Sequence, residues 1–239
     1  MVLEFVGLPG SGKTTIACKF VEGLQERNAS VCFRAIALSD SRSAIIRHLV
    51  RGWFIVRRVF AERRAYWSLV RLVVRSSQDR KLNLLKMVWN GWTVLALISV
   101  CRRQGKVLVS DQGIGQMLWS IGFSASRPLD WELVQKIFNY IRCEDFVFVI
   151  VNVESGIAME RLGSREGSDS RMEDARVLND NEQWRRAESM VQEVAERIRE
   201  LVPGGVFVEV DANGEKSPET LANEILLAHE KLEKGNRGS

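Results

Sequence analysis

The feature that most constrains the fold lies near the start of the chain, where Gly7-Leu8-Pro9-Gly10-Ser11-Gly12-Lys13-Thr14 fits the pattern G-x-x-x-x-G-K-[ST]. Residues 3–6 before it are mostly apolar and predict a short buried strand, whereas residues 13–27 after it carry apolar side chains at helical spacing. A glycine loop between a strand and a helix is much more specific than the pattern alone. It predicts the opening strand, loop and helix of a parallel α/β sheet.

Apolar runs predict four more strands, at residues 31–38, 106–110, 146–153 and 206–210. Helical patterns fill the intervals, among them residues 42–106, 131–141 and 173–201, and a last helix begins with Ser217 as N-cap and Pro218 at its first position. Strands that alternate with helices imply a five-stranded parallel sheet flanked by helices, and 239 residues suit one such domain. Ligands of these sheets bind beyond the carboxyl ends of the strands, where the glycine loop, Asp40 and Asp111 follow the first three.

The glycine loop has the composition of a phosphate site. Glycines let backbone N–H groups converge on a phosphate, and the helix N-terminus adds the positive end of its dipole. Lys13 can reach the β- and γ-phosphates, and the Thr14 hydroxyl can ligate Mg²⁺. The alternative is a glycine turn without a ligand. We therefore expect ATP and Mg²⁺ as cofactors, bound through Gly7, Pro9, Gly10, Ser11, Gly12, Lys13, Thr14 and Thr15.

Two further features are expected beside the loop. Asp111 ends the third strand, where a carboxylate can hold the metal or accept a proton from the acceptor; the alternative is an N-cap for the next helix. Residues 161–173 form a polar segment that carries Arg161, Arg165 and Arg171. Such a segment can act as a lid that places guanidinium groups on the transferring phosphoryl group, and the alternative is a solvated surface loop.

In this order of parts the chain resembles the P-loop kinases of the nucleoside monophosphate group, thymidylate kinase above all. The matching parts are the loop Gly7–Thr14, Asp111, the arginine-bearing run Arg161–Glu173 and Val210-Asp211-Ala212 before the last helix. The resemblance implies a P-loop NTPase fold and ATP- and Mg²⁺-dependent phosphoryl transfer, and because this family is often dimeric, a homodimer stays open. It also implies nucleotide contacts from Arg161 and Asp211 and catalytic roles for Lys13, Asp111, Arg165 and Arg171.

The chain departs from the family where the acceptor nucleotide binds. The family has arginine-glutamate-proline-glycine after the second strand and aspartate-arginine after the third, whereas this chain has Ala37–Arg42 and Asp111-Gln112-Gly113. We therefore expect a kinase whose acceptor is a nucleoside monophosphate or another small hydroxyl compound, anionic or linked to a sugar or lipid. The candidate acceptor contacts are Asp40, Arg42, Arg47 and Gln112. Asp40 could equally cap a helix, and each arginine could be an ordinary surface charge.

Residues 42–106 form a basic segment, with fifteen Lys or Arg against two acids, Glu62 and Asp79. Tryptophans and other apolar residues lie between the arginines. Three interpretations stay open. The segment can form amphipathic helices that pack on the core with their arginines in water, or it can bind an anionic or lipid-linked acceptor or an anionic membrane surface. Nucleic-acid binding is the least favoured of the three.

Other features limit where the protein acts. Its four cysteines form no C-x-x-C pair and its two histidines are far apart, which argues for reduced thiols in an intracellular compartment and against a zinc site. Residues 1–6 are too short for a signal peptide, and the apolar run Val88–Cys101 is too short to span a bilayer and indicates a buried helix. These features predict a cytoplasmic protein, or one peripheral to the inner face of the membrane.

Two other classes of function compete with a kinase. A GTPase would need D-x-x-G and N-K-x-D sequences, which Asp111-Gln112-Gly113-Ile114 and the rest of the chain do not provide. A P-loop NTPase could also serve as a nucleic-acid- or membrane-binding module. Strong, salt-sensitive binding without phosphoryl transfer would identify such a module.

Overall fold

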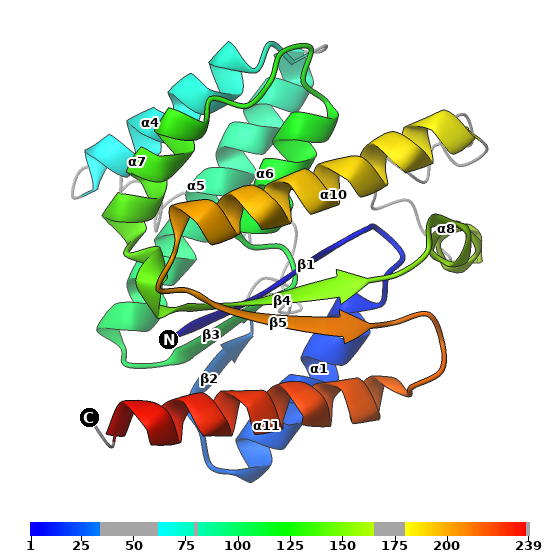
Figure 1. The fold of residues 1–239 in the computed structure, drawn as a ribbon. Helices are drawn as coiled ribbons and strands as arrows, with labels where there is room; N and C mark the ends of the chain where they lie inside the picture. The colour runs from blue at the N-terminus through cyan, green and yellow to red at the C-terminus, as the bar shows by residue number, and fades with distance from the viewer. Residues whose placement is uncertain (34–61, 79–80, 165–179, 238–239) are drawn as a thin grey trace, which may run out of the picture.

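The computed structural model describes residues 1–33, 62–78, 81–164 and 180–237, and in it five strands form one parallel sheet (Figure 1). They are β1 (Val2–Gly7), β2 (Val31–Phe33), β3 (Val107–Ser110), β4 (Phe146–Asn152) and β5 (Val206–Asp211), in the order β2-β3-β1-β4-β5. The central strand β1 pairs with β3 on one side and β4 on the other. The predicted five-stranded parallel sheet is confirmed, and the carboxyl ends of β1 and β3 lie side by side.

Helices cover both faces of the sheet (Figure 1). One face carries α1 (Lys13–Glu26) and α11 (Pro218–Arg237), which pack together. The other face carries α5 (Lys81–Arg103), α6 (Ile114–Phe123) and α10 (Asn181–Leu201), and α4 (Arg63–Arg75) and α7 (Trp131–Ile141) pack against this layer. A short 3-10 helix, Cys143–Asp145, precedes β4, and α8 (Ser155–Gly163) follows it. The helices predicted in the basic segment are confirmed in its described part.

The sheet is apolar on both faces because helices shield both from water. All residues of β4 except the last are buried, as expected for an interior strand of a parallel sheet. On the α1 and α11 side, Phe5 meets Phe20 edge to face with ring centroids 6.4 Å apart. On the other side Phe148 belongs to a larger core that includes Trp184 of α10. Burial of this apolar surface stabilises the strands whose carboxyl ends form the site described below.

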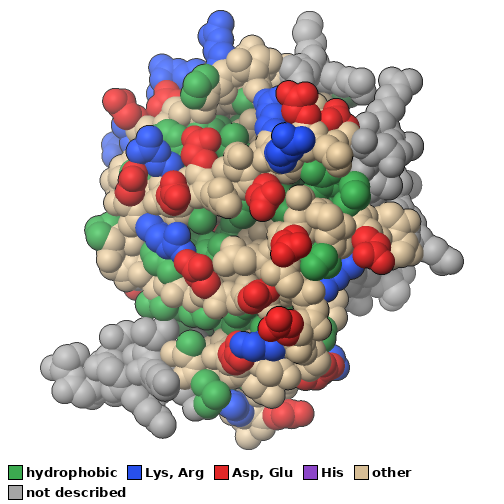
Figure 2. All heavy atoms as spheres, turned by 45° about the vertical axis from the view of Figure 1, so that its right-hand side comes forward, with side chains coloured by type: hydrophobic (Ala, Val, Ile, Leu, Met, Phe, Trp, Pro, Cys, Tyr) green, Lys and Arg blue, Asp and Glu red, His purple; other side chains and the backbone are tan. Residues whose placement is uncertain are grey.

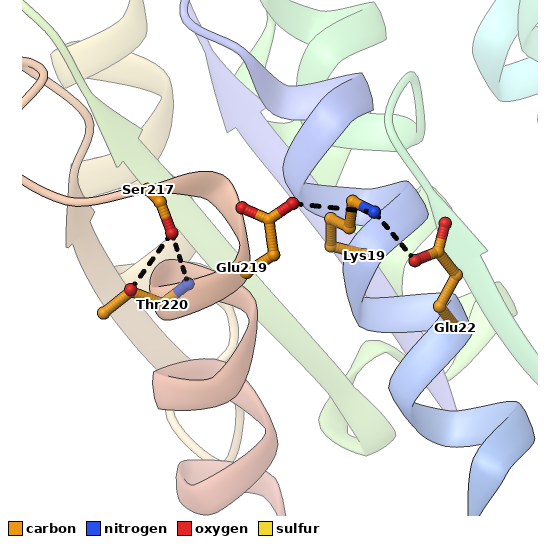
Figure 3. Close-up of polar contacts among 5 residues, drawn as sticks. All are labelled: Lys19, Glu22, Ser217, Glu219 and Thr220. Carbon is orange, nitrogen blue, oxygen red and sulfur yellow. Dashed lines mark hydrogen bonds and ion pairs between the residues drawn. The ribbon is translucent and has the colours of Figure 1, made fainter.

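The start of α11 follows the predicted capping pattern (Figure 3). The backbone N–H of Thr220 donates to Ser217 Oγ at 3.2 Å, and Pro218 is the first helical residue. Nearby, Lys19 of α1 forms ion pairs with Glu22 at 3.0 Å and with Glu219 of α11 at 3.5 Å (Figure 3). Of the two pairs only Lys19–Glu219 links α1 with α11, and both contribute little to stability, since water screens them.

Two helices differ from the expectation. The helix predicted from Glu173 begins only at Asn181, because the Asp180 side chain caps it by accepting hydrogen bonds from the N–H groups of Glu182 and Gln183. The helix α6 was not predicted, because Gly115 and Gly122 lower its intrinsic helix propensity. Packing stabilises α6 instead, since most of its residues are buried.

The apolar helix α5 is longer than the run Val88–Cys101 that marks it in the sequence. The statement that this segment is too short to cross a membrane is therefore wrong, because Leu82–Arg103 has sufficient length and apolar character. Half of its most apolar window is buried, and the helix packs against α4, α6 and β3. Among the described residues it is the only helix of this kind, and its packing agrees with the buried helix that was predicted.

Candidate active site

The loop after β1 has a backbone that only glycine accommodates at two positions. Gly10 has φ of 84°, and a Cβ atom there would lie 2.2 Å from the carbonyl oxygen of Ala158. Gly12 has the same φ but open space around it, so a ligand can approach its backbone closely. The loop therefore curves tightly over α8 and leaves its other side open.

The side chain of Lys13 lies inside this curve. It is buried, and its Nζ donates to the carbonyl oxygen of Gly7 at 2.9 Å, to that of Leu8 at 2.5 Å and to Ser11 Oγ at 3.3 Å. A buried ammonium group requires such acceptors. The contacts hold the positive charge at the N-terminus of α1, where an anionic group would be attracted to both.

Thr14 and Asp111 meet where β1 and β3 end. The Thr14 hydroxyl donates to Asp111 Oδ2 at 2.7 Å, and Asp111 is 5 % exposed. The N-cap of α6 is Gly113, so Asp111 does not cap that helix. The half-buried Thr14 hydroxyl and the buried Asp111 carboxylate supply the hard oxygen atoms that Mg²⁺ prefers.

Cys18, one turn beyond Thr14 on α1, responds to the same carboxylate. Burial raises the pKa of the Cys18 thiol, and the nearby Asp111 carboxylate raises it further. At neutral pH the thiol therefore stays protonated, which makes it a poor nucleophile.

Glu4 of β1 is a site residue that sequence reasoning missed. It is 1 % exposed, and its Oε1 accepts hydrogen bonds from the backbone N–H groups of Gly115 at 2.5 Å and Gln116 at 3.2 Å. A Cβ atom on Gly113 would lie 2.3 Å from the Glu4 carboxyl carbon. Glu4 thus accepts hydrogen bonds from N–H groups at the start of α6 that have no partner within the helix, and so fixes the turn that follows Asp111. An acidic residue within an apolar strand was the signal for it.

Gln116 connects the two loops. Its Oε1 accepts a hydrogen bond from the backbone N–H of Gly7 at 3.3 Å, while its own N–H donates to Glu4. A shift of α6 would therefore change the hydrogen bond at Gly7, the first residue of the glycine loop.

A single cavity of about 680 Å³ joins these groups and extends past them. It is lined by the glycine loop (Pro9, Gly10 and Gly12 to Thr15), then by Asp111, Gln112 and Gly113, and then by one face of α5 and one of α6. Sequence reasoning missed its far wall, which includes Lys86, Met87, Asn90, Gln116, Met117, Ser120 and Phe123. Polar residues four apart, at 86 and 90 and at 116 and 120, were the signal for two helix faces that share one cavity.

The other predicted site residues fall in different places. Arg161 lines the cavity and donates to the carbonyl oxygen of Ala212 at 2.9 Å. Asp211 lies at the end of β5 outside the cavity, where its Oδ1 accepts from the N–H of Asn213 and shapes the turn. Its nucleotide contact stays a prediction. The predicted residues outside the described part of the chain are Asp40, Arg42, Arg47, Arg165 and Arg171.

In the described part of the chain no three acidic, histidine or cysteine side chains cluster as a metal site would require. A metal at Thr14 and Asp111 would thus need further ligands from a bound molecule or water. No protein-family model matches this chain, and no curated protein matches it either.

Proposed function

We propose that this protein is a P-loop kinase of thymidylate kinase-like lineage, which transfers the γ-phosphoryl group of ATP to the hydroxyl group of a small acceptor. The observation that carries the proposal is the shared cavity. It contains the glycine loop, Lys13, Thr14 and Asp111 at one end and continues along α5 and α6 beyond Asp111. A module that only binds a nucleotide has no need of this second half.

The donor end is suited to a triphosphate. Gly10 and Gly12 open the loop, and the N-terminus of α1 points its N–H groups into it. Lys13 now donates to loop carbonyl oxygens, and phosphate oxygens would be stronger acceptors for the same ammonium group. Exchange of these partners would stabilise negative charge on the transferring group.

The Thr14 hydroxyl and the Asp111 carboxylate fit Mg²⁺, either directly or through water. Bound there, the metal would neutralise charge on the β- and γ-phosphates. Asp111 also lies between the two halves of the cavity, where its carboxylate can accept the proton of an acceptor hydroxyl. ATP as the donor agrees with a cytoplasmic protein or one at the inner face of the membrane.

The acceptor end combines amide, hydroxyl and apolar groups. Asn90, Gln116 and Ser120 can hydrogen-bond a polar acceptor, and Met117 and Phe123 can pack against its apolar face. Lys86 is the cation of this wall among the described residues. The wall suits a compact acceptor with hydroxyl groups and one anionic group.

The test is phosphoryl transfer from labelled ATP with Mg²⁺ to a panel of nucleoside monophosphates, nucleosides, sugars, sugar phosphates and polyprenyl alcohols. We expect a labelled product with one acceptor class and at least a roughly thousandfold loss in Lys13→Ala, which removes the charge on the phosphates. A matched control is Lys19→Ala, since Lys19 lies on the same helix but forms surface ion pairs. Equal turnover by Lys13→Ala and Lys19→Ala would refute the proposal.

A further inference from the structure

The helix α4 has two very different faces. Its inner face is apolar and buried against α5 and α7 through residues such as Tyr66, Leu69 and Leu72. Its outer face carries Arg64, Trp67 and Arg71 at spacings of three and four, so these side chains form one stripe. Because these side chains are exposed, packing in the core does not explain why the outer face carries arginines and a tryptophan.

The charge on the outer face has one sign. Arg63, Arg64, Arg71 and Arg75 are all exposed, and the helix contains no acidic residue. Of these four arginines only Arg75 forms an ion pair with another described residue, Asp130, at 2.5 Å. Like charges on a single face repel one another and gain by contact with an anionic surface.

The exposed surface of α10 is different. Its exposed charged residues include both acids and bases, and Arg197 pairs with Glu200 at 2.8 Å. Figure 2, which brings the α8 side of the molecule forward, shows Asp and Glu interspersed with Lys and Arg on that face. The basic character of α4 is therefore local and does not follow from the composition of the whole surface.

Large apolar side chains are exposed beside these arginines. Trp67 is 60 %, Val74 54 %, Leu82 72 % and Leu85 64 % exposed, and these are four of the six exposed large apolar residues in the described chain. Leaving such side chains in water costs free energy that contact with a lipid surface would recover.

The residues of α4 and α5 belong to the same end of the helical layer. The two helices pack antiparallel, because Ser99 of α5 donates to Glu62 at the start of α4, whereas a Cβ on Gly91, earlier in α5, would meet Leu69, later in α4. The end of α4 therefore lies beside the start of α5, and the two meet at the top of Figure 1. The exposed leucines of α5 are thus close to the last turn of α4.

We propose that this surface docks on an anionic lipid bilayer. The α4 surface consists of Arg64, Trp67, Arg71, Val74, Leu82 and Leu85. A basic helix with tryptophan and aliphatic residues lies in the interface of a bilayer, with apolar side chains below the headgroups and arginines at the anionic lipids. Nucleic acid explains the arginines and Trp67 but leaves the exposed valine and leucines without a partner.

Docking would have a geometric consequence for the cavity. Leu82 and Lys86 are one helical turn apart on α5, and Lys86 lines the cavity. A bilayer on the α4 surface would therefore lie close to one end of the cavity. The inference does not depend on kinase activity, because it rests only on the outer face of α4 and the exposed leucines at the start of α5.

The experiment is cosedimentation of the full chain with phosphatidylcholine vesicles, with and without about one third phosphatidylglycerol. We expect at least roughly tenfold stronger partitioning onto the anionic vesicles, weakened but not abolished at physiological salt because apolar contact remains. Duplex and single-stranded DNA serve as competitors in parallel samples.

Variants locate the surface. Arg64→Glu/Arg71→Glu should lower partitioning more than about tenfold, and Trp67→Ala by about three- to tenfold. The matched control is Arg185→Glu/Arg197→Glu on α10, which changes net charge equally and should alter partitioning less than about twofold. Arg64→Gln/Arg71→Gln is a milder second variant, and an unchanged melting temperature confirms folding of each.

Three outcomes would overturn the proposal. The first is no preference for anionic vesicles. The second is an equal loss in the α4 and α10 double variants, which would indicate net charge alone. The third is DNA binding that is stronger than lipid binding and lost with Arg64 and Arg71, which would assign the surface to nucleic acid.

Discussion

The loops that follow β1 and β3 leave neighbouring strands at the same edge of the sheet, but they are shaped in different ways. The loop after β1 is determined by its own residues, because Gly10 and Gly12 adopt a positive φ and Lys13 donates to carbonyl oxygens within the loop. The turn after β3 is determined from a distance, because Glu4 of β1 accepts hydrogen bonds from the N–H groups that follow Asp111.

This difference teaches how the two halves of one site can be maintained. A local loop keeps its shape as long as its own sequence is kept, and it can be recognised from that sequence. A turn held by a distant carboxylate depends on the turn residues and on that carboxylate, and the sequence of the turn does not identify the carboxylate. The hydrogen bond from Gly7 to Gln116 joins the two arrangements.

Asp111→Asn tests what the second loop contributes to chemistry. The variant keeps the shape of the side chain but removes the negative charge that accepts the Thr14 hydrogen bond and would ligate the proposed Mg²⁺. We expect phosphoryl transfer to fall by roughly a thousandfold and the Mg²⁺ concentration for half-maximal rate to rise by at least about tenfold. Steady-state rates over a Mg²⁺ series measure both. An unchanged Mg²⁺ requirement with a lost pH dependence would instead assign Asp111 as the proton acceptor.

Gly10→Ala and Gly12→Ala form a matched pair for the first loop. Both place an alanine at φ of 84°, but only Gly10 also has a carbonyl oxygen 2.2 Å from the new Cβ. We expect Gly12→Ala to lower the free energy of unfolding by about 1–2 kcal/mol through backbone strain. Gly10→Ala should lower it by about 3 kcal/mol, since the clash adds to that strain. Equal losses in urea unfolding would show that the contact with Ala158 can relax.

Glu4→Ala tests the distant control of the second loop. It leaves the buried N–H group of Gly115 and the partly buried N–H group of Gln116 without their acceptor, so we expect a loss of about 2–3 kcal/mol of unfolding free energy. Turnover should fall as well, because the turn after Asp111 loosens. Glu4→Gln keeps an acceptor oxygen and should recover more than half of both losses. A stable Glu4→Ala protein with full turnover would contradict the long-range role.

Much of the fold could be predicted because its determinants are local or periodic. The five parallel strands follow from apolar runs, and the start of α11 follows from Ser217 and Pro218. The glycine loop and Asp111 were found for the same reason, since each directly follows a strand. The start of α10 was missed because Asp180 stops a helical pattern that continues on both sides of it.

The far wall of the cavity could not be predicted from local sequence. Its residues come from α5 and α6, which are separated by β3 and meet only when the sheet has formed. α6 itself was missed because its glycines hide a helix that tertiary packing stabilises. Glu4 was missed because its partners lie more than a hundred residues away. Local patterns thus identify the end of the cavity at the glycine loop, and long-range packing creates the wall formed by α5 and α6.

The smallest expected effect is on the pKa of the Cys18 thiol on α1, which depends on the charge of Asp111 after β3. Asp111 raises the pKa of Cys18, so Asp111→Asn should lower that pKa and give more thiolate at a given pH. Peptide-resolved alkylation of Cys18 should then be faster, with its pH midpoint moved downward. Cys32 is the internal control, because the hydrogen bond from Cys101 lowers the pKa of Cys32 to about 7 independently of Asp111.

The shape of the pH profile separates charge from loosening. A charge effect moves the midpoint for Cys18 and leaves its high-pH plateau unchanged, because the thiolate is no more accessible than before. A loosened turn after Asp111 would raise the plateau instead. A change in the plateau for Cys18 without a change in its midpoint would mean that Asp111 acts on α1 through packing and not through its charge. The loop after β1 would then also depend on a distant residue, through the hydrogen bond between Thr14 and Asp111.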